Sequence, residues 1–127
     1  MKKKNTPTES ELEILQILWQ EGPCPVRKVN EILNQAREVG YTTTLKIMQI
    51  MTEKGLVERD TSQRTHIYKA LVKEKDTQKN LLRTFVDKTY RGSTMSLIMQ
   101  ALGNQEASKD ELDKLKEIIQ SLEKKNK

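Results

Sequence analysis

The sequence predicts a mainly α-helical protein with a small β-hairpin, and three observations lead to this fold class. Two segments open with a capping box, Thr8 with Glu11 and Ser108 with Glu111, which marks the start of a helix. Apolar residues recur at helical spacing through most of the chain. In residues 56–70, by contrast, two runs of β-forming residues flank a short polar turn. Three helices followed by a hairpin predict a winged helix-turn-helix domain, with a helical module after it.

The length of 127 residues allows one small domain and an appendage. We expect the winged-helix domain at residues 1–72 and a three-helix C-terminal module at residues 73–127. A hydrophobic fraction of 35% beside a charged fraction of 32% indicates a small helical protein with a large surface. Such a chain has no room for a large catalytic cavity.

Composition also excludes several function classes. No apolar run approaches the roughly 20 residues that span a bilayer, and the N-terminal lysines precede polar residues rather than a signal-peptide core. We therefore expect a cytoplasmic protein. One cysteine, Cys24, and one histidine, His66, predict neither a disulfide nor a metal ion or other cofactor. Because no Ser, Cys or carboxylate constellation accompanies His66, an enzyme is the least supported class and no catalytic residue is expected.

The first two helices are expected before residue 37. The first runs from its capping box to about Gln20, where a Gly-Pro pair ends it. The second begins at Pro25, which suits a first helical position, and ends near Ala36. Cys24 then holds the preceding cap position, as a small apolar filler or, alternatively, as a functional thiol. The apolar faces of these helices consist of Leu12, Ile14, Leu15, Leu18 and Trp19, and of Val26, Val29, Ile32 and Leu33.

The stretch from Tyr41 to Gly55 predicts the third helix, with Thr42 as its N-cap, Lys54 in its last turn and a left-handed glycine as its end. The face expected to be buried consists of Thr44, Ile47, Met48 and Met51, with Leu45 and Thr52 at its edge. The opposite face consists of Thr42, Thr43, Lys46, Gln49, Ile50 and Glu53. Such a surface suits a helix that enters the DNA major groove. The alternative is that the two threonines only cap the helix and face water.

The hairpin is expected as strands 56–60 and 64–70 joined by the turn 61–63, with His66 on the surface of the second strand and Tyr68 as a core or half-buried packing residue. Residues 1–72 are only slightly basic, so the position of the charges matters more than their sum. The basic side chains that follow the third helix form a stripe suited to phosphates: Lys54, Arg59, Arg64, Lys69 and Lys73. The residues predicted to contact DNA are Thr42, Thr43, Lys46, Gln49, Arg59, Gln63 and Arg64.

The C-terminal module is expected as helices at residues 74–89, at 94–102 and from the Ser108 capping box onward. Its three apolar faces are too large for about 55 residues to bury alone, so a second copy of the chain is the expected partner. The alternative is that these helices fold back on the first domain. The residues predicted to form the dimer are Leu81, Phe85, Leu97, Ile98, Leu102, Leu112, Leu115, Ile119 and Leu122.

Several motifs occur in a characteristic order along the chain. They are Glu-Leu-Glu-Ile-Leu-Gln-Ile-Leu-Trp at 11–19, Pro-Val-Arg-Lys-Val at 25–29, Tyr-Thr-Thr-Thr-Leu-Lys-Ile-Met at 41–48, Glu-Lys-Gly-Leu-Val-Glu-Arg at 53–59, and Tyr68. In this order the chain resembles the penicillinase repressor family (BlaI/MecI type) over about residues 7–122. The resemblance implies a dimeric winged-helix repressor on a palindromic operator. In members that control β-lactam resistance, it also implies release by a membrane sensor-protease system through cleavage of the repressor.

By the same resemblance, Thr42, Thr43 and Lys46 fall where the family's recognition helix contacts DNA, and Arg64 falls in its wing. Ile50 stands where many members carry an Arg, so a contact there is lost or replaced by an apolar contact to a thymine methyl. The family's Asn-Phe cleavage pair corresponds to Gln100-Ala101, the candidate cleavage position of this chain. The cysteine cluster of the copper-responsive branch has no counterpart in the sequence, which disfavours copper sensing by that route.

Together these features predict a sequence-specific DNA-binding transcriptional repressor. It is expected to act as a homodimer on a palindromic operator of β-lactam-resistance or related stress genes and of its own operon. The alternative is a winged-helix adaptor that recognises proteins and has no specific affinity for DNA. The weak positive charge of the first domain and the exposed Ile50 motivate this alternative. No small-molecule ligand is expected.

Overall fold

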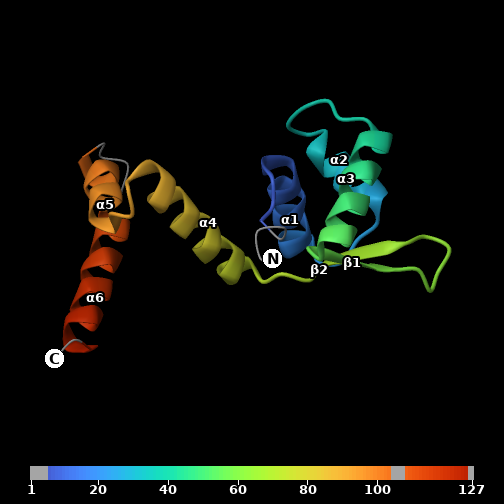
Figure 1. Ribbon diagram of the computed structural model, residues 1–127. Helices are drawn as coiled ribbons and strands as arrows, with labels where there is room; N and C mark the ends of the chain where they lie inside the picture. Colours follow the sequence, from blue (N-terminus) through green and yellow to red (C-terminus); the bar gives the residue numbers. More distant parts are fainter. Residues whose placement is uncertain (1–5, 104–107, 126–127) are drawn as a thin grey trace. The chain divides into compact units, whose positions relative to one another are not determined.

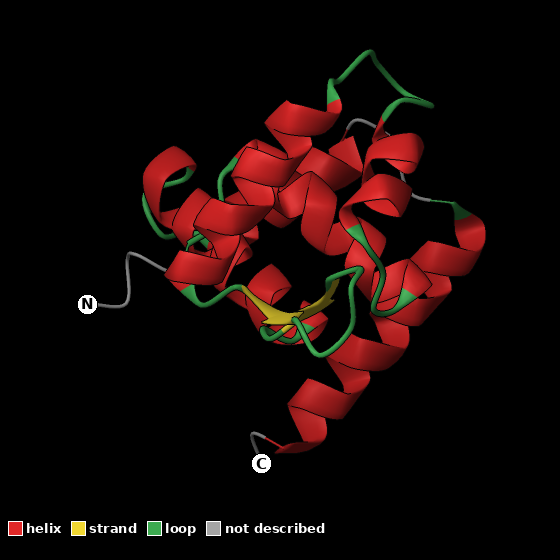
Figure 2. Cartoon of the chain, turned by 90° about the vertical axis from the view of Figure 1, so that its right-hand side faces the viewer, coloured by secondary structure: helices red, strands yellow, loops and turns green. Residues whose placement is uncertain are grey.

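The computed structural model describes residues 6–103 and 108–125 and confirms the predicted fold class, which is mainly helical with one antiparallel hairpin after the third helix (Figure 1). The helices and strands are α1 (Glu9–Glu21), α2 (Val26–Leu33), α3 (Tyr41–Lys54), β1 (Val57–Asp60), β2 (Ile67–Ala70), α4 (Glu74–Thr89), α5 (Thr94–Gly103) and α6 (Lys109–Lys125). The strands of the hairpin are the yellow elements of Figure 2. None of the helices in the described ranges is both long enough and apolar enough to span a bilayer.

The chain divides into two compact units, and the boundary along the sequence falls inside α4, between Leu81 and Leu82. The expected boundary between residues 72 and 73, just before α4 begins, remains a prediction.

The first unit has one hydrophobic core, made by α1, α2, α3 and the hairpin. Its fully buried side chains include Ile14, Leu15, Val29, Met48, Met51, Leu56, Val57 and Tyr68. Thr44 is buried among them, and the predicted inner and outer faces of α3 are both observed. The indole Nε1 of Trp19 donates a hydrogen bond of 3.1 Å to the carbonyl oxygen of Val72, which ties α1 to the segment after the hairpin.

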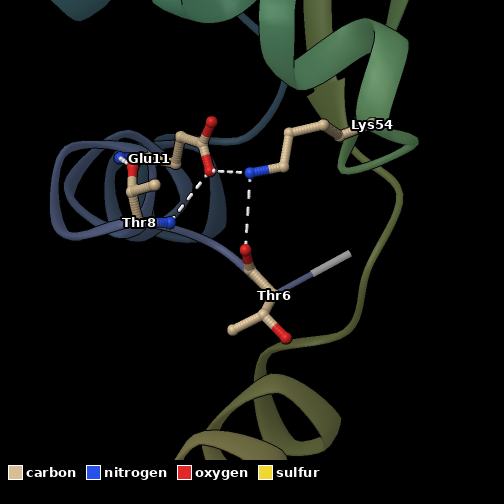
Figure 3. A network of polar contacts seen from close by, with 4 residues as sticks. All are labelled: Thr6, Thr8, Glu11 and Lys54. Carbon is tan, nitrogen blue, oxygen red and sulfur yellow. Dashed lines mark hydrogen bonds and ion pairs between the residues drawn. The ribbon is translucent and has the colours of Figure 1, made fainter. Parts of the chain in front are cut away.

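The capping box of α1 also contacts the end of α3 (Figure 3). One carboxylate oxygen of Glu11, Oε1, accepts from the backbone N–H of Thr8 at 2.9 Å and from Nζ of Lys54 at 2.7 Å. Nζ of Lys54 also donates to the carbonyl oxygen of Thr6 at 3.4 Å. Glu11 is only 4% exposed, so its charge is neutralised inside the protein. The prediction that Lys54 belongs to the phosphate stripe is therefore wrong, because its ammonium group is committed to Glu11.

Two expected helix caps are shifted by one or two residues. Gly40, not Thr42, is the N-cap of α3, because its carbonyl oxygen accepts from the N–H of Thr44 at 3.1 Å. Pro25 is the N-cap of α2 rather than its first residue. The reason is that Cys24 pairs with Tyr68 as an isolated antiparallel bridge, through N–H to O bonds of 3.0 and 2.9 Å, and so remains extended.

Cys24 is a buried thiol, in keeping with the filler role expected from its sequence context. Burial raises the pKa of this thiol above its ordinary value, although the positive charge of Lys28 acts in the opposite direction. A raised pKa leaves the thiol protonated and therefore a poor nucleophile at neutral pH.

The hairpin pairs β1 with β2 in the register Val57–Ala70 to Asp60–Ile67. Its connection covers residues 61–66 and is longer than the predicted turn 61–63. The carboxylate of Asp60 accepts a hydrogen bond of 2.9 Å from the backbone N–H of Ser62, so the chain turns immediately after β1. The same bond lowers the pKa of Asp60. His66 therefore lies in the connection and not, as predicted, in the second strand.

The second unit contains the C-terminal half of α4, from Leu82 to Thr89, together with α5 and α6. Arg91 (φ 53°) and Gly92 (φ 84°) adopt left-handed backbone conformations and separate α4 from α5, as the sequence predicted. The Ser108 and Glu111 capping box opens α6. Within the described residues, neither α5 nor α6 has a buried side chain. An open groove of about 530 Å³ lies between these two helices, lined mainly by apolar residues that include Leu97, Ile98, Leu102 and Leu115.

The substitution Lys54→Ala tests the contact between α1 and α3. It is expected to lower the free energy of unfolding by about 1–3 kcal/mol, because Glu11 stays buried without its ammonium partner. Lys46→Ala is the matched control, since it removes the same charge from an exposed position of the same helix and is expected to change stability by less than about 0.5 kcal/mol. Urea unfolding followed by circular dichroism measures both. Equal stability of the two variants would contradict the role of this ion pair.

Candidate nucleic-acid interface

The start of α3 is positioned by two asparagines, Asn30 within α2 and Asn34 at its C-cap. Nδ2 of Asn30 donates to Oγ1 of Thr44 at 2.8 Å and to the carbonyl oxygen of Val39 at 3.0 Å. Asn34 adds a reciprocal pair with Val39, donating from Nδ2 at 2.9 Å and accepting at Oδ1 at 3.1 Å. Because these bonds join α2 to the first turn of α3, they fix which face of α3 points outward.

The outward face of α3 has the composition predicted for it. The six side chains expected there, Thr42, Thr43, Lys46, Gln49, Ile50 and Glu53, are all exposed. Since Gly40 is the N-cap, the hydroxyl groups of Thr42 and Thr43 lie within the first helical turn and do not serve as caps. They are therefore free to contact an external partner, and so are the amide of Gln49 and the ammonium of Lys46.

A groove of about 700 Å³ lies beside this face. Its walls come from the start of α2, from α3, and from the hairpin with its connection. The lining residues are Pro25, Val26, Arg27, Tyr41, Leu45, Gln49, Arg59, Arg64, Thr65, His66 and Tyr68. Among the residues that the structure describes, no carboxylate lines this groove. It is therefore a cationic cleft next to the candidate recognition helix, and we call it the arginine groove after Arg27, Arg59 and Arg64.

The two faces of the hairpin differ in charge. Arg59 is paired across the strands with Tyr68, and both line the arginine groove. Glu58 and Asp60 instead line a second cleft with Lys69, whose Nζ lies 3.7 Å from Oε1 of Glu58. Arg59 lies between the two clefts and lines both. Alternation along the strand thus separates the carboxylates of β1 from the arginine groove.

Ion pairing separates the cations of the first unit into two groups. Four of them pair with a carboxylate: Lys28 with Glu21, Arg37 with Glu13, Lys54 with Glu11, and Lys69 with Glu58. Within residues 6–81, the cations without such a partner are Arg27, Lys46, Arg59 and Arg64, together with Lys73, Lys75 and Lys79 at the start of α4. The first four lie on the outer face of α3 or in the arginine groove. Their charge is available to an external anion.

The predicted DNA-contacting residues fall into three places. Gln49, Arg59 and Arg64 line the arginine groove, Thr42, Thr43 and Lys46 lie on the exposed face of α3, and Gln63 is exposed in the connection of the hairpin. Sequence reasoning missed Arg27, Tyr41 and His66 as groove residues. The position of Arg27 in the first turn of α2 could have indicated it, because the first helix of a helix-turn-helix motif crosses the DNA backbone.

Comparison with known proteins supplies the family. The family model described as Penicillinase repressor matches residues 7–121. The chain belongs to the penicillinase repressor family. The resemblance found in the sequence is thereby confirmed, and the match includes both the winged-helix domain and the C-terminal helices.

Individual relatives of this repressor are distant but align over nearly the whole chain. The penicillinase repressor of Staphylococcus aureus is 23% identical over 116 residues, which cover 91% of this chain and 92% of the relative. The methicillin resistance regulatory protein MecI of Mammaliicoccus sciuri is 23% identical over 112 residues, covering 88% and 91%. The penicillinase repressor of Bacillus licheniformis is 22% identical over 120 residues, covering 94% of each.

Family membership establishes the coarse function. The protein is a DNA-binding winged-helix transcriptional repressor from a family of non-enzymatic regulators, as the sequence predicted. Within residues 6–103 and 108–125, no cluster of three or more His, Cys, Asp or Glu side chains could hold a metal ion. The contacts made by individual residues remain predictions.

Arg27→Ala tests the arginine groove. It is expected to weaken binding to a mixed-sequence DNA duplex and to reduce the slope of log affinity against log salt by about 0.9, the effect of one lost phosphate contact. Lys69→Ala is the control, since it removes the same charge from the other face of the hairpin, where Glu58 already pairs with it. Fluorescence anisotropy over a range of salt concentrations measures both variants. Equal slopes for Arg27→Ala, Lys69→Ala and the unchanged protein would show that Arg27 does not touch DNA.

Proposed function

We propose that this repressor acts as a homodimer on a palindromic operator, with α3 of each copy in the major groove. The observation that supports this most directly is the position of the unpaired cations of residues 6–72, which lie on the outer face of α3 and in the adjacent arginine groove. The arginine groove gathers cations and, among the described residues, no carboxylate lines it, which suits a polyanion.

Base recognition is assigned to the N-terminal half of α3. Thr42 and Thr43 carry hydroxyl groups that donate to or accept from base edges, and Lys46 donates to guanine acceptors one turn later. Gln49 suits adenine, whose N6 and N7 form a donor and acceptor pair in the major groove. Ile50 is 41% exposed and offers an apolar contact to a thymine methyl in place of the arginine of many relatives.

Backbone contacts are assigned to the hairpin. Arg59 and Arg64, together with Gln63 in the connection, bind phosphates of the DNA strand that runs beside α3. Such contacts fix the orientation of the domain on the duplex but carry no sequence information. A repressor needs both kinds of contact, because side chains that read bases select the site and side chains that bind phosphates keep the protein in register on it.

The homodimer is assigned to the second unit. Exposed apolar side chains there include Phe85, Ile98, Leu102, Leu112, Ile119 and Leu122 from the predicted dimer set, and Met95, Met99 and Ile118 in addition. Leu97 and Leu115 are half-buried, and Leu81 lies in the first unit. A single copy leaves much of this apolar surface in water, whereas a second copy of the same helices can cover it.

The regulated genes are proposed from the relatives. The names of those relatives refer to penicillinase and to methicillin resistance, which points to β-lactam-resistance or related stress genes and to the operon of the repressor itself. Binding to operator DNA assigns the protein to the cytoplasm. Release by a membrane sensor-protease system is a further part of the proposal. The candidate cleavage pair, Gln100-Ala101, is exposed but lies inside α5, so that helix must open before a protease can bind.

Binding to fragments selected from total genomic DNA tests the proposed function. A repressor dimer that neutralises roughly 6 to 10 phosphates should lose affinity with a log-log salt slope of order −5 to −9. Ile119→Glu is expected to convert the dimer to a monomer in sedimentation velocity and to weaken this binding at least about tenfold, because the two half-site contacts are no longer linked.

The control for that variant is Gln120→Glu, which adds the same charge at a polar, exposed position of α6. It should leave the dimer and the affinity unchanged. Absent or salt-independent binding of the unchanged protein would favour the protein-binding adaptor. A variant Ile119→Glu that remains dimeric would show that the dimer forms elsewhere.

A further inference from the structure

His66 is the single histidine of the sequence, and the fold gives it an unexpected place. It lies at the end of the hairpin connection, is exposed, and lines the arginine groove. In a surface position on the second strand, as the sequence suggested, it would have no defined neighbours. In the arginine groove it shares a cleft with three guanidinium groups.

The charged and titratable groups facing His66 come from every wall of the groove. They are Arg27 on α2, Tyr41 on α3, Arg59 on β1, Arg64 in the connection and Tyr68 on β2. None of these is a carboxylate, and the carboxylates Glu58 and Asp60 of β1 line the other cleft. Within the described part of the chain, the groove therefore supplies no counter-ion for a protonated imidazole. A counter-ion has to come from a bound partner.

We propose that His66 is an additional phosphate contact in the arginine groove, and that its protonation is coupled to DNA binding. This inference rests on the proposed DNA-binding function. A neutral imidazole offers one N–H donor, whereas the imidazolium offers two donors and a full positive charge. Its hydrogen bond to a phosphate oxygen then becomes charge-assisted, which is the stronger type.

The sign of the pH effect follows from linkage. A phosphate beside His66 favours the protonated ring, so the complex binds more protons than the free protein. Affinity for DNA therefore increases as the pH falls through the range in which imidazole titrates, about pH 5 to 8. Because the contact is to the backbone, the effect does not depend on the base sequence.

The test uses the full-length protein and a mixed-sequence duplex of about two helical turns, with ionic strength held constant. Fluorescence anisotropy should give an affinity about three- to tenfold higher at about pH 5.5 than at about pH 8.5, the limit for uptake of one proton over a shift of about one unit. The log-log salt slope should be steeper at the lower pH by up to about 0.9, since one more cation neutralises a phosphate.

Two substitutions at the same exposed position serve as opposite controls. His66→Gln keeps a donor but cannot be charged, so its affinity should stay at the weaker level across the pH range. His66→Arg is always charged, so its affinity should stay at the stronger level. Thermal melting confirms that both variants fold. Unequal pH profiles of the unchanged protein and His66→Gln support the coupling, whereas identical profiles overturn it.

A nuclear magnetic resonance titration gives an independent readout, because one histidine produces one imidazole C2 proton signal. The midpoint of its titration should move to higher pH when the duplex is added. An unmoved midpoint in a complex that does form overturns only the role of His66. Failure to bind the duplex at every pH and salt concentration overturns the proposed function as well, so the two failures are distinguishable.

Discussion

The interface depends on one buried carboxylate, that of Glu11, which joins the start of α1 to the end of α3. It satisfies a free backbone donor in the capping box of α1 and at the same time neutralises Lys54. At the other end of α3, Asn30 binds the hydroxyl of Thr44. With both ends held by polar contacts and the middle packed through Met48 and Met51, α3 cannot rotate about its axis without breaking buried interactions. Its exposed face is thus defined by the fold.

The distribution of ion pairs explains how a domain with little net charge can still suit DNA. The carboxylates of the first unit are not spread evenly, since Glu11, Glu13, Glu21 and Glu58 each pair with a cation away from the arginine groove. The groove itself keeps its three arginines unpaired among the described residues. The local electrostatic potential, which determines where a phosphate binds, is therefore more positive in the arginine groove than the total charge of the domain suggests.

The fold could be predicted from the sequence because its signals are local. Both capping boxes, the left-handed Gly55 and the 3.6-residue periodicity act within a few residues, so the helices were located to within a few positions. The errors have tertiary causes. The sequence favours Thr42 as the cap because the role of Gly40 depends on its backbone conformation, and it favours a phosphate contact for Lys54 because Glu11, its partner in the fold, is distant in sequence.

The site could be predicted only in part for the same reason. The exposed face of α3 follows from periodicity, but the arginine groove joins residues from α2, α3 and the hairpin, which no local pattern brings together. Arg27 and His66 were missed because their neighbours are set by the packing of the hairpin, including the bridge between Cys24 and Tyr68. Arg59 and Arg64 could be predicted as interface residues from side-chain type alone, since an arginine in a wing suits phosphates whatever its exact surroundings.

Hydroxyl-radical footprinting of the full-length protein on a selected genomic fragment tests the central claim most directly, namely that two copies present α3 and the arginine groove to one operator. The expected result is two protected backbone regions related by a dyad, with centres one helical turn of about 10 base pairs, or a multiple of it, apart. A single protected region without dyad symmetry, or protection that does not depend on sequence, would contradict a homodimer that reads a palindrome.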